Sequence, residues 1–287
     1  MTRTRAAIAV LAALAALPLA GCSGEQSIAD QARSIARAAE VEQVREVLLG
    51  NGTLSLVYER DGAFFEGYAA NGDLAEAPLD LAPTAASASL DELDVDAWSD
   101  AVAEQAAICP DAEMGRLFRA PTGAVVVESG CLGADGIATV RTRIDGPERA
   151  GAAGMATAEA IDGALEDARL VLGEELADFQ SAGDAIGMSA RITGAPTADG
   201  CLPSLVRTAR EGSVEFAGEA CLPPDGAAPR TFSIAPDAVD GARVMAAVEA
   251  AGAEPDMISE IDLGLDEAGA FGVRWAAADG TSGFERL

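Results

Sequence analysis

Four cysteines constrain the fold of this chain more than any other feature. Apart from Cys22 near the N terminus, the cysteines are Cys109, Cys131, Cys201 and Cys221. An even set of this kind is typical of disulfides formed in an oxidising compartment. Three pairings are possible. We expect Cys109–Cys131 and Cys201–Cys221, because each pair brackets a sequence that reads as strand, turn and strand. The alternative, free thiols or a metal site, lacks the CxxC spacing common in metal sites.

The N terminus has the composition of an export signal. Arg3 and Arg5 precede an Ala- and Leu-rich run over residues 6–20, which Pro18 interrupts. A helix that crosses a bilayer needs about 20 apolar residues, so this run is too short to span one. A charged start followed by an apolar run of this length is typical of a signal peptide. We therefore expect export. Because Thr4 separates the two arginines, there is no adjacent twin-arginine pair, and we expect export in the unfolded state.

The apolar run ends in Leu19-Ala20-Gly21-Cys22, which resembles the lipobox of bacterial lipoproteins. In that family the cysteine thiol receives a diacylglyceryl group, and a peptidase cleaves the chain just before it. The resemblance implies a signal peptide over residues 1–21 and a lipidated tether over residues 22–26. It also implies that lipid on Cys22 holds the protein at the extracytoplasmic face of the cell membrane. The alternative is a conventional secretory signal in which Cys22 is an ordinary cysteine.

The charge of the chain restricts its partners. The formal net charge is −28, and all 19 basic residues are arginine, because the sequence contains no lysine and no histidine. Nucleic acids and anionic membrane surfaces are bound through basic side chains, so we expect neither as a direct partner. A cationic ligand, divalent metal ions or a basic protein would suit this charge. We nevertheless expect solubility to explain most of the carboxylates.

Helical and strand patterns alternate along the first half of the mature chain. Apolar residues recur at helical spacing over 28–49, and the segment TLSLVYE then alternates as a half-buried strand does. Asp61-Gly62 is typical of a two-residue hairpin turn before the strand AFFEGYA. Asp94 or Asp96 can begin a second helix, which the strands MGRLFRA, AVVVES and IATVRTRID follow. The pattern therefore indicates helices packed on an antiparallel sheet.

The second half repeats this order. We expect a helix over 157–179, strands and turns over 186–234, and another helix from Pro236, because proline favours the first helical position. The strands ISEIDLGL and AFGVRWA then end the chain. The sequence thus predicts an α+β fold of two similar units, 27–150 and 151–287, each with a disulfide-bridged hairpin. Such tandem units are similar to PepSY-like domains and beta-lactamase inhibitory proteins, which are extracytoplasmic binding and inhibitory modules.

The missing residue types exclude most enzyme chemistry. Without histidine the chain cannot form a Ser-His-Asp triad, a Cys-His pair or a histidine-containing zinc site. Without lysine it has no Walker A lysine, Schiff base or Ser-x-x-Lys acylase. The G-x-S-x-G motif and a dinucleotide-binding glycine motif are also missing. We expect no cofactor, and carboxylate chemistry or an Asp-bound metal are the activities that remain.

Three acidic groups are candidates for that chemistry. We expect helix capping and solvation to explain the first, a solvated helix face the second, and turn formation the third. Trp98 and Trp275 fall on core faces, whereas at least one aromatic residue of the hairpin Phe64, Phe65 and Tyr68 must face outward. The three acidic groups are Asp91, Glu92, Asp94, Asp96 and Asp100; Glu166, Asp167, Glu174, Glu175 and Asp178; and Asp262, Asp266 and Glu267.

These observations predict a lipid-anchored extracytoplasmic binding or accessory protein without catalytic activity. We expect it to bind a component of the cell envelope, with another protein as the first candidate. A carboxylate-dependent hydrolase or a divalent-metal-binding protein is the first alternative, and a carrier of an apolar ligand is the second. Buried, adjacent carboxyl groups with raised pKa values in a cleft would favour the hydrolase. A flat, exposed apolar patch would favour the binding protein.

Overall fold

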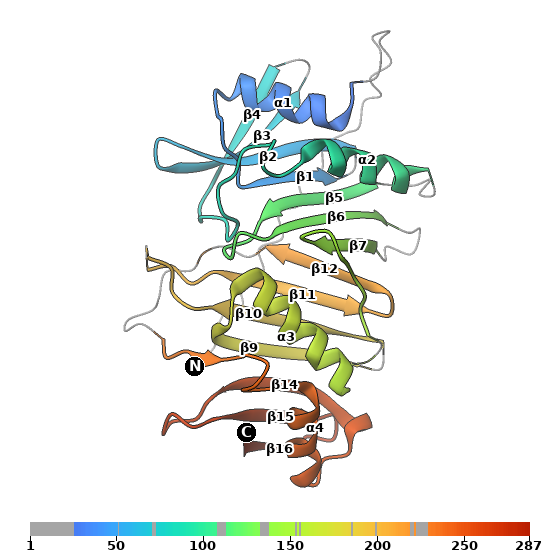
Figure 1. Cartoon of the computed structure of the whole chain (residues 1–287), viewed down its shortest axis with the longest axis vertical. Coiled ribbons are helices and arrows are strands. Elements are labelled where there is room, and N and C mark those ends of the chain that lie inside the picture. Colours follow the sequence, from blue (N-terminus) through green and yellow to red (C-terminus); the bar gives the residue numbers. More distant parts are fainter. Residues whose placement is uncertain are drawn as a thin grey trace.

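A computed structural model shows two antiparallel sheets with two helices packed on each, which confirms the predicted α+β fold (Figure 1). The structure describes residues 26–50, 52–70, 73–107, 113–132, 138–152, 154, 156–184, 186–198, 200–218, 221 and 229–287. The predicted signal peptide, Cys22 and Cys109 lie outside these residues. Within the described part of the chain, no helix is both long and apolar enough to cross a membrane.

The first unit contains an eight-stranded sheet in the order β4-β3-β2-β1-β5-β6-β7-β8, in which neighbouring strands are antiparallel. Its elements are α1 (Ile28–Ala38), β1 (Glu46–Gly50), β2 (Thr53–Arg60), β3 (Ala63–Ala70), β4 (Asp73–Leu79), α2 (Val95–Ala106), β5 (Glu113–Arg119), β6 (Val125–Leu132), β7 (Ala138–Ile144) and β8 (Glu148–Arg149).

The second unit contains a sheet in the order β12-β11-β10-β9-β14-β15-β16, and the short strand β13 pairs with β9. Its elements are α3 (Ala158–Leu172), β9 (Glu175–Gly183), β10 (Gly187–Gly194), β11 (Ser204–Arg210), β12 (Ser213–Gly218), β13 (Phe232–Ser233), α4 (Gly241–Ala250), a 3₁₀ turn (Pro255–Met257), β14 (Ile258–Leu265), β15 (Phe271–Ala277) and β16 (Ser282–Arg286).

The two units share one arrangement of elements. Each begins with a helix and a four-stranded meander, continues with a second helix and ends with three further strands. In each sheet the first strand of the meander lies at the centre and pairs with the strand that follows the second helix, as β1–β5 and β9–β14. The late segments α2-β5-β6 and α4-β14-β15 correspond in this arrangement. The units differ in the short strands β8 and β13.

Several local signals act as the sequence indicates. Ser27 caps α1, because its side chain accepts a hydrogen bond from the N–H of Asp30. Asp94 caps α2 in the same way, through the N–H of Ala97. Asp61 and Gly62 both have positive φ angles, 53° and 78°, which a type I′ turn between β2 and β3 requires. The predictions made at Asp94 and at Asp61-Gly62 are therefore confirmed.

Three predicted helix boundaries are wrong. The helix expected over 28–49 ends at Ala38, and the segment EVLLG forms β1 because it pairs with both β2 and β5. The helix expected over 157–179 ends at Leu172, where Gly173 adopts a φ angle of 96° before β9 begins. The last helix begins at Gly241 with Asp240 as its cap, five residues after Pro236. In each case sheet pairing or capping prevails over apolar spacing.

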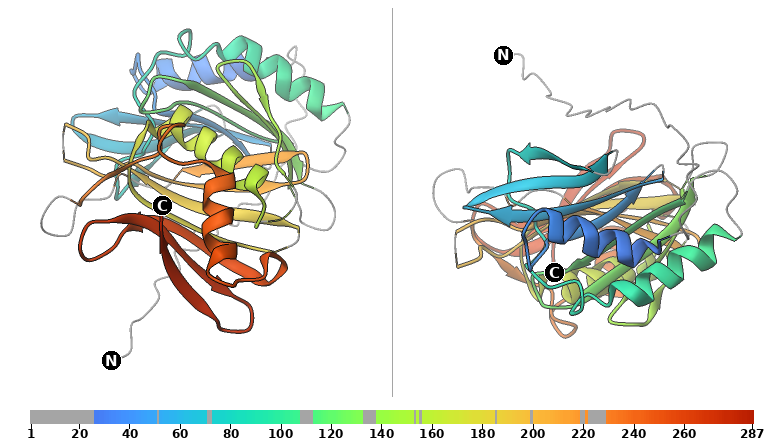
Figure 2. Two further views of the ribbon diagram at one scale, coloured as in Figure 1. Left: turned by 60° about the horizontal axis from the view of Figure 1, so that its bottom comes forward. Right: turned by 90° about the horizontal axis from the view of Figure 1, so that it is seen from above.

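The helices cover one side of the stacked sheets (Figures 1 and 2). One core cluster lies between α1, α2 and the first sheet, with Trp98 fully buried at its centre. The other cluster belongs to the second unit, but it also includes Phe118, Val126 and Ile144 of the first. Because this second core crosses the boundary, the units share buried apolar surface and are packed against one another.

Candidate ligand cavity at the junction of the two sheets

The two sheets meet where the edge strand β12 lies beside β7 (Figure 1). Side chains bridge the two strands. The hydroxyl of Ser213 accepts from the N–H of Val140 at 3.3 Å and donates to the carbonyl of the same residue at 3.0 Å. The hydroxyl of Thr142 donates to the carbonyl of Val214. These bonds occupy polar backbone groups that an edge strand would otherwise leave unpaired.

Two charged side chains hold the middle of β12. Strand register places Arg116 of β5 opposite Glu128 of β6, on the open face of the first sheet, which we define as the face away from α1 and α2. Arg116 donates from Nη1 to the carbonyl of Phe216 at 2.7 Å, and Glu128 Oε1 accepts the N–H of Phe216 at 2.6 Å. Both backbone groups of Phe216 are therefore bound by the first sheet.

A cavity of about 490 Å³ lies beside these contacts, and we call it the junction cavity. Its floor is the open face of β1, β2, β5 and β6, with Glu66 reaching in from β3, and β12 forms its wall. Gly50 and Met114 are cross-strand neighbours on this floor. A Cβ atom placed on Gly50 would meet no atom within 4 Å, so the missing side chain leaves part of the space open. The lining residues are Glu46, Leu48, Leu49, Gly50, Thr53, Ser55, Glu66, Met114, Gly115, Arg116, Glu128, Ser129, Val140, Glu215, Phe216 and Ala217.

The charged lining consists of four glutamates and one arginine. Arg116 forms a two-pronged ion pair with Glu46, with Nε and Nη2 lying 3.1 and 2.8 Å from the two carboxylate oxygens. Burial lowers the pKa of Arg116, but the charges of Glu46, Glu128 and Glu215 outweigh it and raise the pKa overall. The guanidinium is therefore charged and already matched to a carboxylate.

Glu128 is the least ordinary titratable group of the cavity. Its side chain is 4 % exposed, and burial raises its pKa from 4.5 to about 7. The charge of Arg116 and the hydrogen bond from Phe216 lower the pKa, whereas the charge of Glu215 raises it further. A carboxyl group of this kind exchanges a proton near neutral pH.

A second polar contact joins the units away from the cavity. Asp167 of α3 is 1 % exposed and binds Arg149 of β8 and Arg207 of β11, each through Nε at 2.6 Å. Arg149 also pairs with the more exposed Glu166 at 2.8 Å. The interpretation of Asp167 as part of a solvated helix face is therefore wrong, because α3 turns this residue towards β8 and β11.

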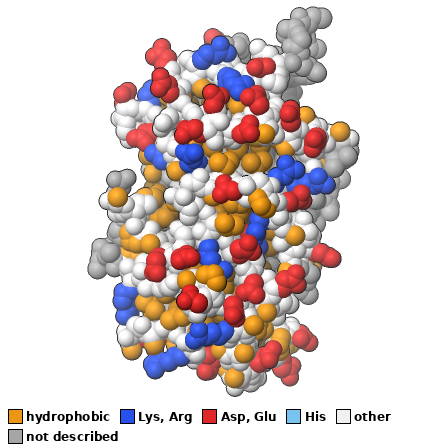
Figure 3. All heavy atoms as spheres, viewed as in Figure 1, with side chains coloured by type: hydrophobic (Ala, Val, Ile, Leu, Met, Phe, Trp, Pro, Cys, Tyr) orange, Lys and Arg blue, Asp and Glu red, His pale blue; other side chains and the backbone are white. Residues whose placement is uncertain are grey.

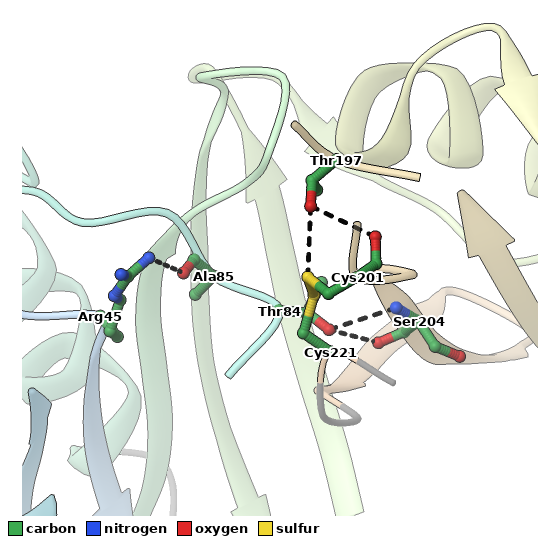
Figure 4. Close-up of a disulfide and its surroundings, with 7 residues drawn as sticks. All are labelled: Arg45, Thr84, Ala85, Thr197, Cys201, Ser204 and Cys221. Carbon is green, nitrogen blue, oxygen red and sulfur yellow. Dashed lines mark hydrogen bonds between the residues drawn. A yellow bond between two sulfur atoms is a disulfide. The ribbon is translucent and has the colours of Figure 1, made fainter. Parts of the chain in front are cut away.

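A third contact between the units lies beside the disulfide Cys201–Cys221 (Figure 4). It brackets β11 and β12, as expected. The segment 82–86 of the first unit crosses to this region, where Thr84 Oγ1 donates to the carbonyl of Ser204 at 2.7 Å and accepts from its N–H at 3.2 Å. The N–H of Cys221 donates to the carbonyl of Ala82. Cys131 is also disulfide-bonded, and its pairing with Cys109 stays a prediction.

The other acidic candidates have structural roles. In the first group, Asp94 caps α2, which confirms the capping interpretation for this residue, whereas Asp96 in the first turn binds Arg33 and Glu92 accepts the N–H of Ser89 at 2.8 Å. Asp266 accepts the N–H of Ala270 in a turn, as expected. Acidic side chains are scattered over the visible face of both units instead of forming one patch (Figure 3).

Glu175 and Asp178 do not lie on a helix, because both belong to β9. Asp178 and Asp262 share the helix-free face of the second sheet, where burial raises the pKa of each. Among the described residues, however, no group of three or more acidic or cysteine side chains could hold a metal ion.

The aromatic residues also follow the core interpretation. Trp98 is fully buried and donates from Nε1 to the carbonyl of Glu128 at 3.0 Å, and Trp275 is 6 % exposed. Phe64 and Phe65 are partly exposed on β3, and the guanidinium groups of Arg45 and Arg60 lie over their rings. Neither tryptophan lines the junction cavity.

Sequence reasoning missed the residues that matter most here, namely Glu46, Glu66, Arg116, Glu128 and Glu215. Each is one polar residue within a strand, and alternation allows such a residue to face solvent. The sequence did contain one usable signal: Glu128 interrupts the apolar run AVVVES, and Arg116 interrupts MGRLFRA. No protein-family model and no curated protein matches this sequence.

Proposed function

We propose that this chain is a lipid-anchored extracytoplasmic binding protein without catalytic activity, and that it holds a small ligand in the junction cavity. The single observation that carries the proposal is the cavity itself. Small-molecule sites commonly occupy about 300–1,000 Å³ and lie preferentially between structural units. This cavity lies between two packed units and combines apolar side chains with a few placed charges. It replaces a protein partner as our first candidate, because a concave site of this volume suits a small molecule.

The lipid anchor is the independent part of the proposal, and it rests on the lipobox resemblance at Leu19-Ala20-Gly21-Cys22. Intact mass spectrometry of protein extracted gently from its own membrane tests it. We expect the chain to begin at Cys22 and to carry the added mass of acyl chains. A chain that begins at another residue, or a Cys22 without lipid, would overturn the anchor and leave the cavity proposal unaffected.

A pair of matched glycine variants tests the cavity. A valine at position 50 would project into the open space above β1, whereas Gly264 of β14 offers equal space in the second sheet, outside the cavity. Valine is favoured in strands, so both variants are expected to fold. In native mass spectra of the full-length protein, we expect a co-purifying small molecule with the unaltered chain and Gly264→Val, and loss of that molecule with Gly50→Val. Equal retention by both variants would overturn this site.

A carboxylate-dependent hydrolase is the second candidate, and one observation favours it. Glu128 has a pKa of about 7 and lines a cavity with three other glutamates, which is suitable for a general acid. Against this, Arg116 binds both oxygens of Glu46, and Glu128 Oε1 is engaged by Phe216. The test is turnover of a panel of nitrophenyl glycosides by the unaltered chain and by Glu128→Gln. Turnover that Glu128→Gln abolishes, with the fold intact, would establish the hydrolase instead.

A further inference from the structure

The negative charge of the junction cavity is not balanced by its own residues. Arg116 is matched to Glu46, and it also donates to the backbone of β12. The ion pairs of the described residues include neither Glu66 nor Glu215. Glu66 accepts one hydrogen bond, from the hydroxyl of Ser55 at 2.7 Å. A neutral hydroxyl leaves the charge of that carboxylate in place.

The two unmatched carboxylates come from different walls of the cavity. Glu66 belongs to β3, which pairs with β2 at one end of the floor of the cavity. Glu215 belongs to β12, whose neighbouring residue Phe216 is bound to β5 and β6. In the sheet, β2 and β1 lie between β3 and β5. At the usual strand spacing, roughly 14 Å therefore separates β3 from β5. The floor between them carries the apolar side chains of Leu48 and Met114 beside Thr53, Ser55 and the Glu46–Arg116 ion pair.

The apolar part of the lining defines the rest of the ligand. Leu48 and Met114 contribute partly exposed side chains to the floor, and the buried side chains of Val140 and Phe216 lie where β7 and β12 meet. Apolar side chains of this kind favour a hydrocarbon or aromatic body, because its burial removes apolar surface from water. A simple metal ion would leave the partly exposed side chains of Leu48 and Met114 uncovered.

We infer that the ligand of the junction cavity is an organic cation, an amine or guanidinium compound with an apolar body, whose charged group is recognised by Glu66 or Glu215. This inference rests on the proposed binding function and specifies its ligand class. Hydrogen bonds from the ammonium or guanidinium group to the free carboxylates provide recognition, and the floor between β2 and β6 packs against the body. An anionic ligand is disfavoured, because Arg116, the cationic residue of the cavity lining, is already paired with Glu46.

Three probes with one aromatic body and different head groups test the charge: benzylamine, benzyl alcohol and benzoate. Binding to the detergent-solubilised full-length protein is measured at pH 7.5 by ligand-observed nuclear magnetic resonance. We expect benzylamine to bind about tenfold more tightly than benzyl alcohol, which corresponds to one charge-assisted contact, and benzoate to bind more weakly than both. Equal affinity for the three probes, tighter binding of benzoate, or no binding of benzylamine would each overturn the inference.

Charge variants locate the contact and separate this inference from the proposed function. We expect Glu66→Gln or Glu215→Gln to lower the preference for benzylamine over benzyl alcohol by threefold or more. The control is Glu211→Gln, the same change at an exposed position in the β11–β12 turn outside the cavity. If Gly50→Val abolishes binding of the probes but neither charge variant changes the preference, the site stands and the cation is wrong. If Gly50→Val leaves benzylamine binding unchanged, the site itself is wrong.

Discussion

Glu128 on the first sheet accepts the backbone N–H of Phe216 on the edge of the second, with 2.6 Å between Oε1 and N. Arg116 completes the contact by donating to the carbonyl of Phe216 at 2.7 Å. An edge strand normally offers such groups to water or to another strand. Here they are bound by the side chains of a neighbouring sheet, and the same contact forms one side of the junction cavity. The residues that join the two sheets therefore also line the junction cavity.

Removal of the Glu128 side chain should weaken the junction. Glu128→Ala leaves the N–H of Phe216 without its acceptor and removes a carboxylate from the surroundings of Arg116. A buried polar group without a partner costs about 1–3 kcal/mol, and more when a charge is involved. We expect the free energy of unfolding in urea to fall by about 3 kcal/mol. Glu211→Ala, on the exposed β11–β12 turn, should change it by less than about 0.5 kcal/mol. Similar effects of the two substitutions would contradict this role of Glu128.

The raised pKa of Glu128 predicts a specific dependence of stability on pH. The folded state holds the proton of Glu128 up to a pKa of about 7, whereas the unfolded chain releases it near 4.5. Stabilisation is therefore complete below pH 4.5 and is lost as the pH rises through 7, by about 3 kcal/mol in total. Glu128→Gln cannot titrate and removes this contribution.

The measurement is the difference in unfolding free energy between the unaltered chain and Glu128→Gln, in urea at intervals from pH 5 to pH 8. The difference cancels the titration of the other carboxylates. We expect the unaltered chain to lose stability relative to Glu128→Gln as the pH rises. A constant difference over this range would show that the pKa of Glu128 is ordinary.

Asp167 should be much more important for stability than its neighbour Glu166. Asp167→Ala leaves the guanidinium groups of Arg149 and Arg207 without their shared carboxylate, and Arg207 is 1 % exposed. Breaking a buried ion pair by removing one partner costs about 3–5 kcal/mol. Glu166 pairs with the same Arg149, but its side chain is 56 % exposed, so Glu166→Ala should cost less than about 1 kcal/mol. Urea unfolding of the two variants measures this contrast, and equal losses would refute it.

The disulfide Cys201–Cys221 should stabilise the second unit. The cysteines are separated by 20 positions, and closing a loop of this size contributes about 3 kcal/mol in the chain-entropy account. We expect the double variant Cys201→Ser/Cys221→Ser to lose about this amount in thermal or urea unfolding. A reducing agent should lower the stability of the unaltered chain. In the double variant it cannot act through this disulfide, because both cysteines have been replaced. An unchanged free energy of unfolding for the double variant would rule out a stabilising role.

Local sequence signals predicted the parts of the fold that depend on a few neighbouring residues. Asp61-Gly62 specifies a hairpin because both residues tolerate positive φ angles. The cap Asp94 was also identifiable, because a short acidic side chain satisfies the first free N–H groups of a helix. By contrast, the apolar segment EVLLG fits a helix or a strand equally well. Its pairing partners β2 and β5 decided between them, and β5 lies more than 60 residues further along the chain.

By itself, the sequence determined the residue types that are available, the export signal that it resembles, the alternation of helices and hairpins, and the excess of carboxylates. Only the tertiary structure decided which carboxylates lose water and which meet one another. Glu46, Arg116 and Glu128 are far apart in sequence, and strand register places them on one face, beside an edge strand from the other unit. Register depends on long-range backbone pairing and shared burial, for which no short stretch of sequence carries a signal.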